Sequence, residues 1–439
     1  MPTGIHLIAV IALLTASAAS TASTTAVPAS PPAHGLRAAF EQAWGHHPHA
    51  RAAPERDQAQ AALQRAATSW LAAQPAISLS TETDRLHRDR GEQEQGVALS
   101  LPVRWPSQRD SGLAQAAQTA LWRDAELARA RWELAGAVRQ AWWQCQRTAV
   151  QAMLAARQEA HAQTLADDVA RRVAAGDLAR ADGHQARMAQ ARAAAEAAQA
   201  QAEQAAARAQ LQALLGEGVL RAAQVCDTVS PPSPATPLQA VLDPEPWPDP
   251  AVDTVSANHA VENAHPAWAS WQARAALSER ATAYAAAQAR GEPEVTLGWL
   301  HQREQHGERP RQAVALALRL PLGRAPASQA AVAEARAEAA LAAAEGEPLR
   351  QRLQADWLSA QARHAAATAQ LAAAQRRAAL ARDTLGFIER AFRAGEADLP
   401  TLLRITHEAF EAEQHAALAH IDLAAARSAI RQAAGLLPP

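Results

Sequence analysis

Two glycines in the chain are each followed closely by acidic residues, and these carboxylates are the first candidates for chemistry. Asp177 and Asp182 follow Gly176, and Glu396 and Asp398 follow Gly395. Carboxylates grouped around an opening select cations, whereas a solvated carboxylate at a helix start is simply stabilised by the helix dipole. Each glycine is expected to end one helix in a left-handed cap, so that the acids begin the next helix and both interpretations stay open.

Histidines offer a second kind of chemistry, but their positions do not favour it. His46, His47 and His49 could hold a soft cation, and we favour solvated histidines at a helix start. His87, His301 and His306 fall in two polar loops, where exposed side chains are expected. No Ser/His/Asp, paired-carboxylate or phosphate-loop arrangement stands out. We therefore expect no enzyme, no cofactor and no metal site.

The two glycines belong to a set of landmarks that occurs twice. His47-Pro48 and Pro75 recur 218 residues later as His265-Pro266 and Pro293, and Pro102, Gly176 and Gly216 recur 219 residues later as Pro321, Gly395 and Gly435. A register that holds over so much of the chain predicts an internal two-fold repeat. The first repeat spans residues 36–216 and the second spans 258–439.

Both repeats have the same predicted order of elements. The first contains a helix over 36–73, a strand pair over 76–102, a helix over 107–175, the turn at Gly176 and a further helix. The second contains a strand pair over 294–321, a helix over 327–394 and the turn at Gly395, with a break expected at Gly346-Glu347-Pro348. The helix over 107–175 carries a heptad-like seam of Leu127, Leu134, Val138, Cys145, Ala149 and Ala152. We expect a mainly α fold with a small β part, in which long antiparallel helical hairpins accompany four strands.

The remaining sequence points to an exported protein. Residues 1–20 have the apolar run and small residues of a signal peptide. Eight prolines within 217–257 predict an irregular connector between the repeats. The net charge of −2, with both signs interspersed, offers no surface for nucleic acid. A disulfide between Cys145 and Cys226 would suit an oxidising compartment but is not required, because Cys145 also fits the seam, and we expect the two to be unpaired.

The number of strands constrains the assembly. Each predicted strand has about nine residues, the length that a tilted strand needs to cross a membrane. In lipid every backbone polar group must be paired, so a four-stranded sheet with open edges cannot stand alone. Two chains would give eight strands and a barrel filled by its own side chains, whereas three would give twelve strands and a pore. We therefore expect a trimer.

The duplicated landmarks also carry a family resemblance. The two His-Pro starts, Gln74-Pro75, Leu99-Ser100-Leu101-Pro102, Leu318-Arg319-Leu320-Pro321-Leu322, Ala175-Gly176-Asp177 and Ala394-Gly395-Glu396 together resemble the TolC family of outer-membrane efflux proteins. The resemblance implies a homotrimer in the outer membrane of a Gram-negative bacterium, with a twelve-strand barrel in the lipid, an α-helical tunnel in the periplasm and the connector in an equatorial belt. It also implies an exit duct of a tripartite efflux or secretion system, whose periplasmic adaptor and inner-membrane pump dock at the lower turns.

Two details of the resemblance bear on the site and the cargo. Family members often place acidic residues just after the turn glycine, which implies a periplasmic gate made by Gly176, Asp177, Asp182, Gly395, Glu396 and Asp398. The second repeat departs from this pattern, because Thr401 stands where the first has Asp182. Leu320-Pro321-Leu322 followed by Ser328-Gln329-Ala330 is similar to the heavy-metal cation efflux subgroup, so metal cations are one candidate cargo. The alternative, a periplasmic coiled-coil structural or adaptor protein, does not explain the two strand pairs.

Overall fold

The computed structural model describes residues 35–86, 90–218, 265–323 and 325–439, together with 221–222, 226 and 245–246. The expected signal peptide (1–20), most of the expected connector (217–257) and His87 lie outside the described residues. Among the helices of the described part, none is both long and apolar enough to cross a membrane.

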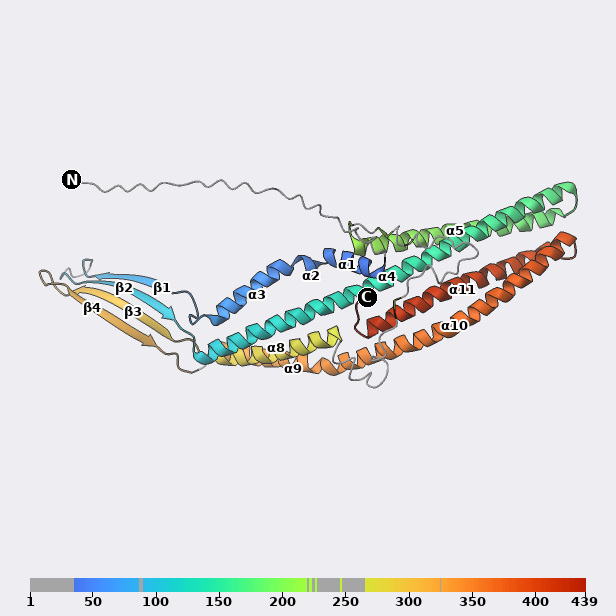
Figure 1. The fold of residues 1–439 in the computed structure, drawn as a ribbon. Helices are drawn as coiled ribbons and strands as arrows, with labels where there is room; N and C mark the ends of the chain where they lie inside the picture. The colour runs from blue at the N-terminus through green and yellow to red at the C-terminus, as the bar shows by residue number, and fades with distance from the viewer. Residues whose placement is uncertain are drawn as a thin grey trace, which may run out of the picture. The chain divides into compact units, whose positions relative to one another are not determined.

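Long helices dominate the described chain (Figure 1). The longest, α4 (Pro106–Ala175), has 70 residues, which corresponds to about 105 Å. It forms an antiparallel hairpin with α5 (Arg180–Leu215), and α10 (Gly346–Ala394) forms a second hairpin with α11 (Leu399–Ala433). The shorter helices are α1 (Leu36–His46), α2 (Pro48–Arg51), α3 (Ala53–Thr68), α8 (Pro266–Gln288) and α9 (Pro326–Ala344). The expected mainly α fold with a small β part is confirmed.

The helix expected over residues 36–73 is divided into α1, α2 and α3, and it ends five residues early. Its interruptions coincide with Pro48 and Pro54, which stand in the first turns of α2 and α3, where a missing N–H costs nothing. The early end arises because the chain after Thr68 pairs with the segment that follows the second strand. Arg104 N–H donates to Trp70 O at 2.8 Å, and Ala72 N–H donates to Pro102 O at 2.9 Å.

The break expected at Gly346-Glu347-Pro348 is present, since α9 ends at Ala344 and α10 begins at Gly346. A neighbouring helix explains why glycine stands there. A Cβ at Gly346 would collide with the indole ring of Trp271 on α8. The same indole donates through Nε1 to Ala342 O at 2.7 Å, so the break lets α8 pack directly against the end of α9.

The four strands form one antiparallel sheet in the order β1-β2-β3-β4. They span β1 (Ala76–Thr83), β2 (Gln93–Pro102), β3 (Glu294–Arg303) and β4 (Arg311–Arg319). The two strand pairs, which lie far apart in the sequence, therefore join through β2 and β3. Within the described residues β1 and β4 each have a strand on one side only, so both edges of the sheet are open.

The two faces of the sheet differ sharply in side-chain size. The register aligns Ile77, Leu99, Leu297 and Leu316 in one row across all four strands, and Leu79, Val97, Trp299 and Val314 in the next row on the same face. The opposite face carries Ser78, Ala98, Gly298 and Ala315 in one row. These large apolar side chains, except the half-buried Leu99, are exposed in the single chain, with Leu79 at 79% and Leu316 at 74%. One face therefore carries a continuous apolar band, and the central rows of the other face carry small residues apart from Leu300.

The expected helical seam forms the main core. Leu134, Val138, Cys145, Ala149 and Ala152 are buried on α4, and of the six expected seam residues Leu127 alone is only half-buried. The seam packs against Leu211 and Leu215 of α5 and against Leu418 and Ile421 of α11. Because alanine supplies much of the buried surface, the helices can approach closely without large side chains.

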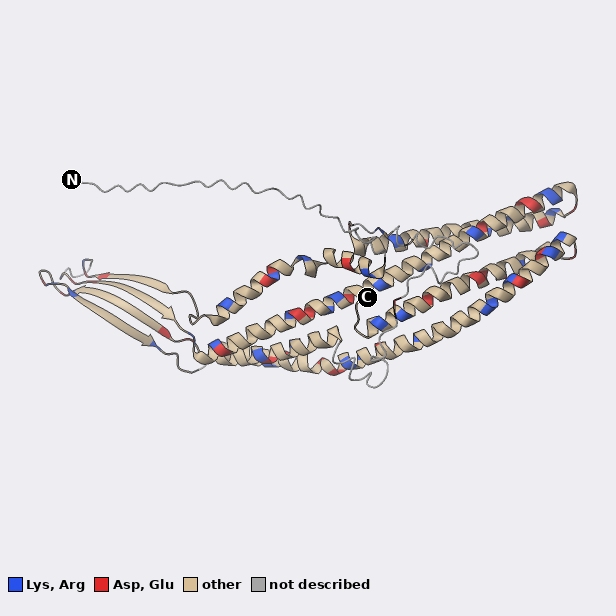
Figure 2. Cartoon of the chain, viewed as in Figure 1, with Lys and Arg blue, Asp and Glu red and all other residues tan. Residues whose placement is uncertain are grey.

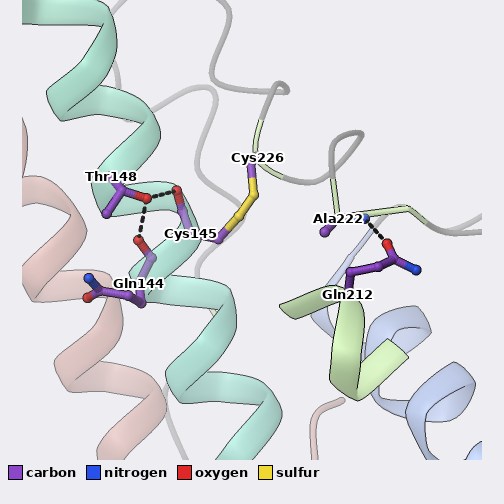
Figure 3. Close-up of a disulfide and its surroundings, with 6 residues drawn as sticks. All are labelled: Gln144, Cys145, Thr148, Gln212, Ala222 and Cys226. Carbon is purple, nitrogen blue, oxygen red and sulfur yellow. Dashed lines mark hydrogen bonds between the residues drawn. A yellow bond between two sulfur atoms is a disulfide. The ribbon is translucent and has the colours of Figure 1, made fainter. Parts of the chain in front are cut away.

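The expectation that Cys145 and Cys226 are unpaired is wrong. A disulfide joins them, with their Cα atoms 5.5 Å apart (Figure 3). Cys145 fits the seam as expected, but its sulfur also reaches the segment that follows α5. Beside it Gln212 Oε1 accepts from Ala222 N–H at 2.9 Å. The sequence could not place Cys226, because no helical or strand periodicity fixes the position of a residue in a proline-rich connector.

We expect Cys226→Ala to destabilise the chain by about 3–5 kcal/mol, because the disulfide closes a loop across 81 residues of the sequence. The measurement is denaturant unfolding in detergent, combined with thiol titration of the unfolded wild-type protein, which should contain no free thiol. The double variant with Cys145→Ala provides the control. It should lose only the small additional amount due to truncating a buried side chain. Free thiols in the wild type would contradict the pairing.

Candidate functional site at the two helical turns

The first helical turn reverses the chain at Gly176. This glycine has φ +88°, the left-handed conformation that non-glycine residues adopt at a cost. The N–H of Asp177 donates to Arg172 O at 2.9 Å, which closes the end of α4. After three residues α5 begins at Arg180, and Asp182 Oδ2 accepts from the backbone N–H of Ala179 at 3.1 Å. The expected left-handed cap is confirmed here.

The second turn repeats this backbone geometry at Gly395, with φ +80°. The N–H of Glu396 donates to Ala391 O at 2.9 Å, which is the same closure as in the first turn. Asp398 is the N-cap of α11, and its Oδ1 accepts from the N–H of Thr401 at 3.0 Å. Hydrogen bonds from the side chain and the backbone N–H of Thr401 lower the pKa of the Asp398 carboxyl below its usual range.

The two turns cap their helices with carboxylates from different positions. In the first turn the residue three positions inside the helix, Asp182, reaches back to the N-cap backbone. In the second turn the N-cap residue, Asp398, reaches forward to the third position, Thr401. These are the two halves of a capping box. The apparent departure at Thr401 therefore has a structural reason: the carboxylate has moved from one half of the box to the other.

Arginines, which sequence reasoning missed, accompany the acidic residues at both turns. Arg171, Arg172 and Arg180 flank the first turn in the sequence, and Arg393 precedes the second. Figure 2 shows basic and acidic residues interspersed at this end of both hairpins. Arg172 pairs with Asp168 at 3.2 Å, and Arg393 approaches Glu389 at 3.9 Å. Asp177, Glu396 and Asp398 are exposed, and Asp182 is half-buried. Any field from these carboxylates is thus partly offset by nearby guanidinium groups.

The histidines do not gather at a shared site. His47 caps α2 through its Nδ1, which accepts from His49 N–H at 3.3 Å, and His49 lies 2.9 Å from the guanidinium of Arg56. His301, which was expected in an exposed loop, is half-buried on β3, so that expectation is wrong because the strand continues to Arg303. His306 lies in the loop after β3 as expected, and its backbone N–H donates to Arg90 O at 3.0 Å. Over the described ranges, no group of three or more His, Cys, Asp or Glu side chains could hold a metal ion.

The repeated His-Pro landmarks have a structural meaning as helix starts. His265 caps α8 as His47 caps α2, with Nδ1 accepting from Ala267 N–H at 3.2 Å, and Pro266 begins the helix. His265 is fully buried against the ring of Trp132, with centroids 4.6 Å apart. Burial lowers the pKa of His265 to about 4, because the charged imidazolium would lose its hydration.

The repeated glycines that end each half lie against these helix starts. A Cβ at Gly435 would come within 2.8 Å of Pro266 Cδ and 3.0 Å of His265 Cδ2. A Cβ at Gly216 would come within 2.9 Å of the His46 ring. Glycine is therefore needed at both places for close approach, and each half brings its last glycine back to its own His-Pro start.

A buried ion pair that sequence reasoning missed ties the two hairpins together. Arg139 of α4 donates through Nε and Nη2 to the two carboxylate oxygens of Glu245, at 3.0 and 2.8 Å. Arg431 of α11 lies on the other side, with its Nε 3.5 Å from Glu245 Oε1. Separating α11 from α4 would leave one of these buried charges without its partner, which is strongly unfavourable. Glu245, held between Arg139 and Arg431, therefore fixes α11 against α4. No signal in the sequence marks Glu245, which lies among the prolines of the connector.

The chain is similar to known proteins in structure but not in sequence. No family model matches the chain, and no curated protein matches it in sequence. The structure is similar to that of CusC, a protein described in connection with transmembrane channel formation, at 16% identity and a TM-score of 0.71 over 91% of this chain and 92% of that one. The outer membrane protein VceC from Vibrio cholerae gives 16% identity and a TM-score of 0.69 over 92% and 97%. The CmeC outer membrane channel of Campylobacter jejuni gives 12% identity and a TM-score of 0.70 over 91% and 85%. The chain has the fold of outer-membrane channels. This is the fold that the resemblance to the TolC family predicts.

The neutral cap at His265 makes stability depend on pH. In the unfolded chain His265 titrates near 6.5, and in the folded chain near 4. The contribution of neutral His265 to the free energy of unfolding is therefore fully present above pH 6.5. It is lost as the pH falls toward 4, where the folded state must also bury a charged imidazolium. We expect His265→Asn, which keeps a side-chain cap but cannot be protonated, to lose less thermal stability than wild type between pH 7 and pH 4.5. His161→Asn, at a position that caps no helix, is the control and should follow wild type.

Proposed function

We propose that this chain is the outer-membrane exit duct of a tripartite export system and that it works as a homotrimer. The observation that carries the proposal is the sheet, in which an exposed apolar band covers one face while small residues line the other. A soluble protein rarely leaves such a band uncovered. Lipid against the band and a lumen behind the small residues would satisfy both faces.

The open edges of the four-stranded sheet support an assembly of three copies. Backbone groups along the outer sides of β1 and β4 need partners in a membrane, and copies of the same chain supply them edge to edge. Three copies give a twelve-stranded barrel with room for a pore. The long hairpins would then form the tunnel in the periplasm, with the two halves of each chain as a two-fold repeat and the connector as an equatorial belt. The alternative, a periplasmic coiled-coil adaptor, would leave the apolar band exposed to water.

The partners and cargo follow from the same proposal. The turn between α4 and α5 and the turn between α10 and α11 lie at the ends of the hairpins away from the sheet (Figure 1); they contain Gly176 and Gly395. They are where a periplasmic adaptor and an inner-membrane pump of a Gram-negative bacterium would meet the duct. Cargo would pass without chemistry through the tunnel to the exterior, and metal cations are one candidate cargo. Asp177, Asp182, Glu396 and Asp398 would form carboxylate rings at the lower entrance.

A matched pair of substitutions on adjacent residues of β4 tests the two faces. Leu316→Arg would place a charge in lipid, which costs about 2–4 kcal/mol near the bilayer centre. It should sharply reduce the fraction of folded, membrane-inserted trimer. Ala315→Arg, on the small-residue face, should still insert and assemble but should reduce the cation conductance in planar bilayers. Native mass measurement in detergent should find three chains for wild type; a protein found only as a monomer, or equal insertion of both variants, would contradict the proposal.

The carboxylates at the turns are tested by removing charge while keeping the caps. Asp182→Asn with Asp398→Asn leaves a side-chain oxygen to accept each backbone N–H, but removes two negative charges per chain. We expect weaker cation selectivity in planar bilayers, with an effect that shrinks at high salt because exposed charges are screened. Selectivity equal to that of wild type at low salt would mean that these acids only cap helices. Asp110→Asn, on the first turns of α4 near the sheet, is the control.

A further inference from the structure

The apolar band on the sheet ends abruptly on the side of the loops that join β1 to β2 and β3 to β4. Its last apolar row there consists of Leu79, Val97, Trp299 and Val314. The next row on the same face is polar on all four strands and consists of Thr81, Gln95, His301 and Gln312. The row beyond it is polar as well and consists of Thr83, Gln93 and Arg303. Trp299 stacks on His301 at this margin, with ring centroids 5.8 Å apart, and tryptophan is typical of the boundary between lipid and water.

The band has a second margin on the side of the helices. Alternation along β2 places Val103 on the band face, and an isolated bridge pairs Val103 with Leu71. The residue before Leu71 is Trp70, whose side chain is exposed. The guanidinium carbon of Arg109 lies 4.7 Å from the centroid of the Trp70 ring. An exposed tryptophan with a cation over its ring therefore marks this margin, as Trp299 marks the other.

The height of the band follows from the length of strand between its two margins. Along β2 and its continuation the apolar face runs from Val97 to Val103, which is about seven residues and about 20 Å of extended chain. Strands tilted by about 35–45° in a barrel convert this length into about 14–17 Å across the membrane. Half a row spacing at each margin adds about 5 Å. The resulting band of about 20 Å is lower than the band of about 25 Å that outer-membrane barrels usually have.

We propose that the apolar band fits a thin bilayer, with a hydrocarbon core of about 20 Å, so that the partner of this face is lipid with short acyl chains. The inference rests on the proposed function, because it requires lipid against the band. In a thicker bilayer the polar row that contains Gln95 and Gln312 would enter hydrocarbon unless the lipid became thinner around the barrel. Either adjustment costs free energy that grows with the mismatch, so bilayer thickness should control the stability of the assembled duct.

The test measures the stability of the full-length trimer in phosphatidylcholine bilayers that differ only in acyl-chain length, from about 12 to about 20 carbons. The readout is the ratio of folded to unfolded protein at equilibrium in a fixed concentration of urea. This ratio should be highest with chains of about 14 carbons or fewer. It should be at least about fivefold lower with the longest chains, because the mismatch with the band is then greatest.

A matched pair of double variants on β2 and β4 shows whether the band sets this preference. Gln95→Leu with Gln312→Leu extends the apolar band by one row on two strands and should move the optimum to longer chains, by about two carbons. Glu94→Leu with Arg311→Leu changes the neighbouring residues of the same strands, which lie on the opposite face. This control leaves the band unchanged, so its optimum should equal that of wild type.

Three results would overturn the fit to a thin bilayer. They are a wild-type optimum at more than about 14 carbons, an unchanged optimum in the variant with both glutamines replaced, and an equal shift in the control. If the variant with both glutamines replaced does not assemble, Gln312→Leu alone is judged by the same criterion. A wild-type chain that inserts into none of these bilayers would instead refute the proposed function, so the two failures are distinguishable.

Discussion

The constraint on which the rest of the structure depends is the pairing of the backbone at the edges of the sheet. Over the described residues, β1 and β4 each present one row of N–H and C=O groups without a neighbouring strand. The face that these strands share with β2 and β3 is a band of large apolar side chains. Water would satisfy the edges but not the band, and lipid would satisfy the band but not the edges. Additional strands in lipid would satisfy both, which is the physical reason for proposing an assembly of several copies.

The helices pack closely together through small side chains. Their buried positions are largely alanine, with occasional leucine, valine and tryptophan, so helix axes can lie close together over a great length. Specific polar contacts between the helices are few, and they fix the position of one helix along another. Trp143 Nε1 donates to Ser428 Oγ at 2.8 Å, and Trp132 Nε1 donates to Gln432 O at 2.8 Å, which fixes α11 along α4. Polar contacts of this kind set the register, which a smooth alanine surface alone would leave undefined.

Much of the fold could be predicted from the sequence because the repeated landmarks are short motifs that determine the local backbone geometry. A His-Pro pair is a cap followed by a first-turn proline, and a glycine after a long helix is a left-handed cap, so each signal carries its own geometry. Strand boundaries followed from period-two alternation, and the break near Gly346 from a glycine and a proline. The features that could not be predicted are those that join distant segments. The disulfide of Cys226, the carboxylate of Glu245 between two arginines, and the contact of Gly346 with Trp271 each depend on a partner that no periodicity identifies.

The two hairpins are attached to the rest of the chain in different ways. The α4/α5 hairpin is continuous along α4 and is bound covalently to the connector through Cys145. The chain is interrupted at Glu345 before α10 begins, and both cysteines of the sequence, Cys145 on α4 and Cys226 after α5, lie outside the α10/α11 hairpin. Its strongest attachment is at the far end of α11, where Arg431 and Gln432 meet Glu245, Arg139 and Trp132. The polar contacts that position α11 along α4 are therefore concentrated at the end of α11 nearest Glu245, so that this part of the connector and the last turns of α11 hold each other in place.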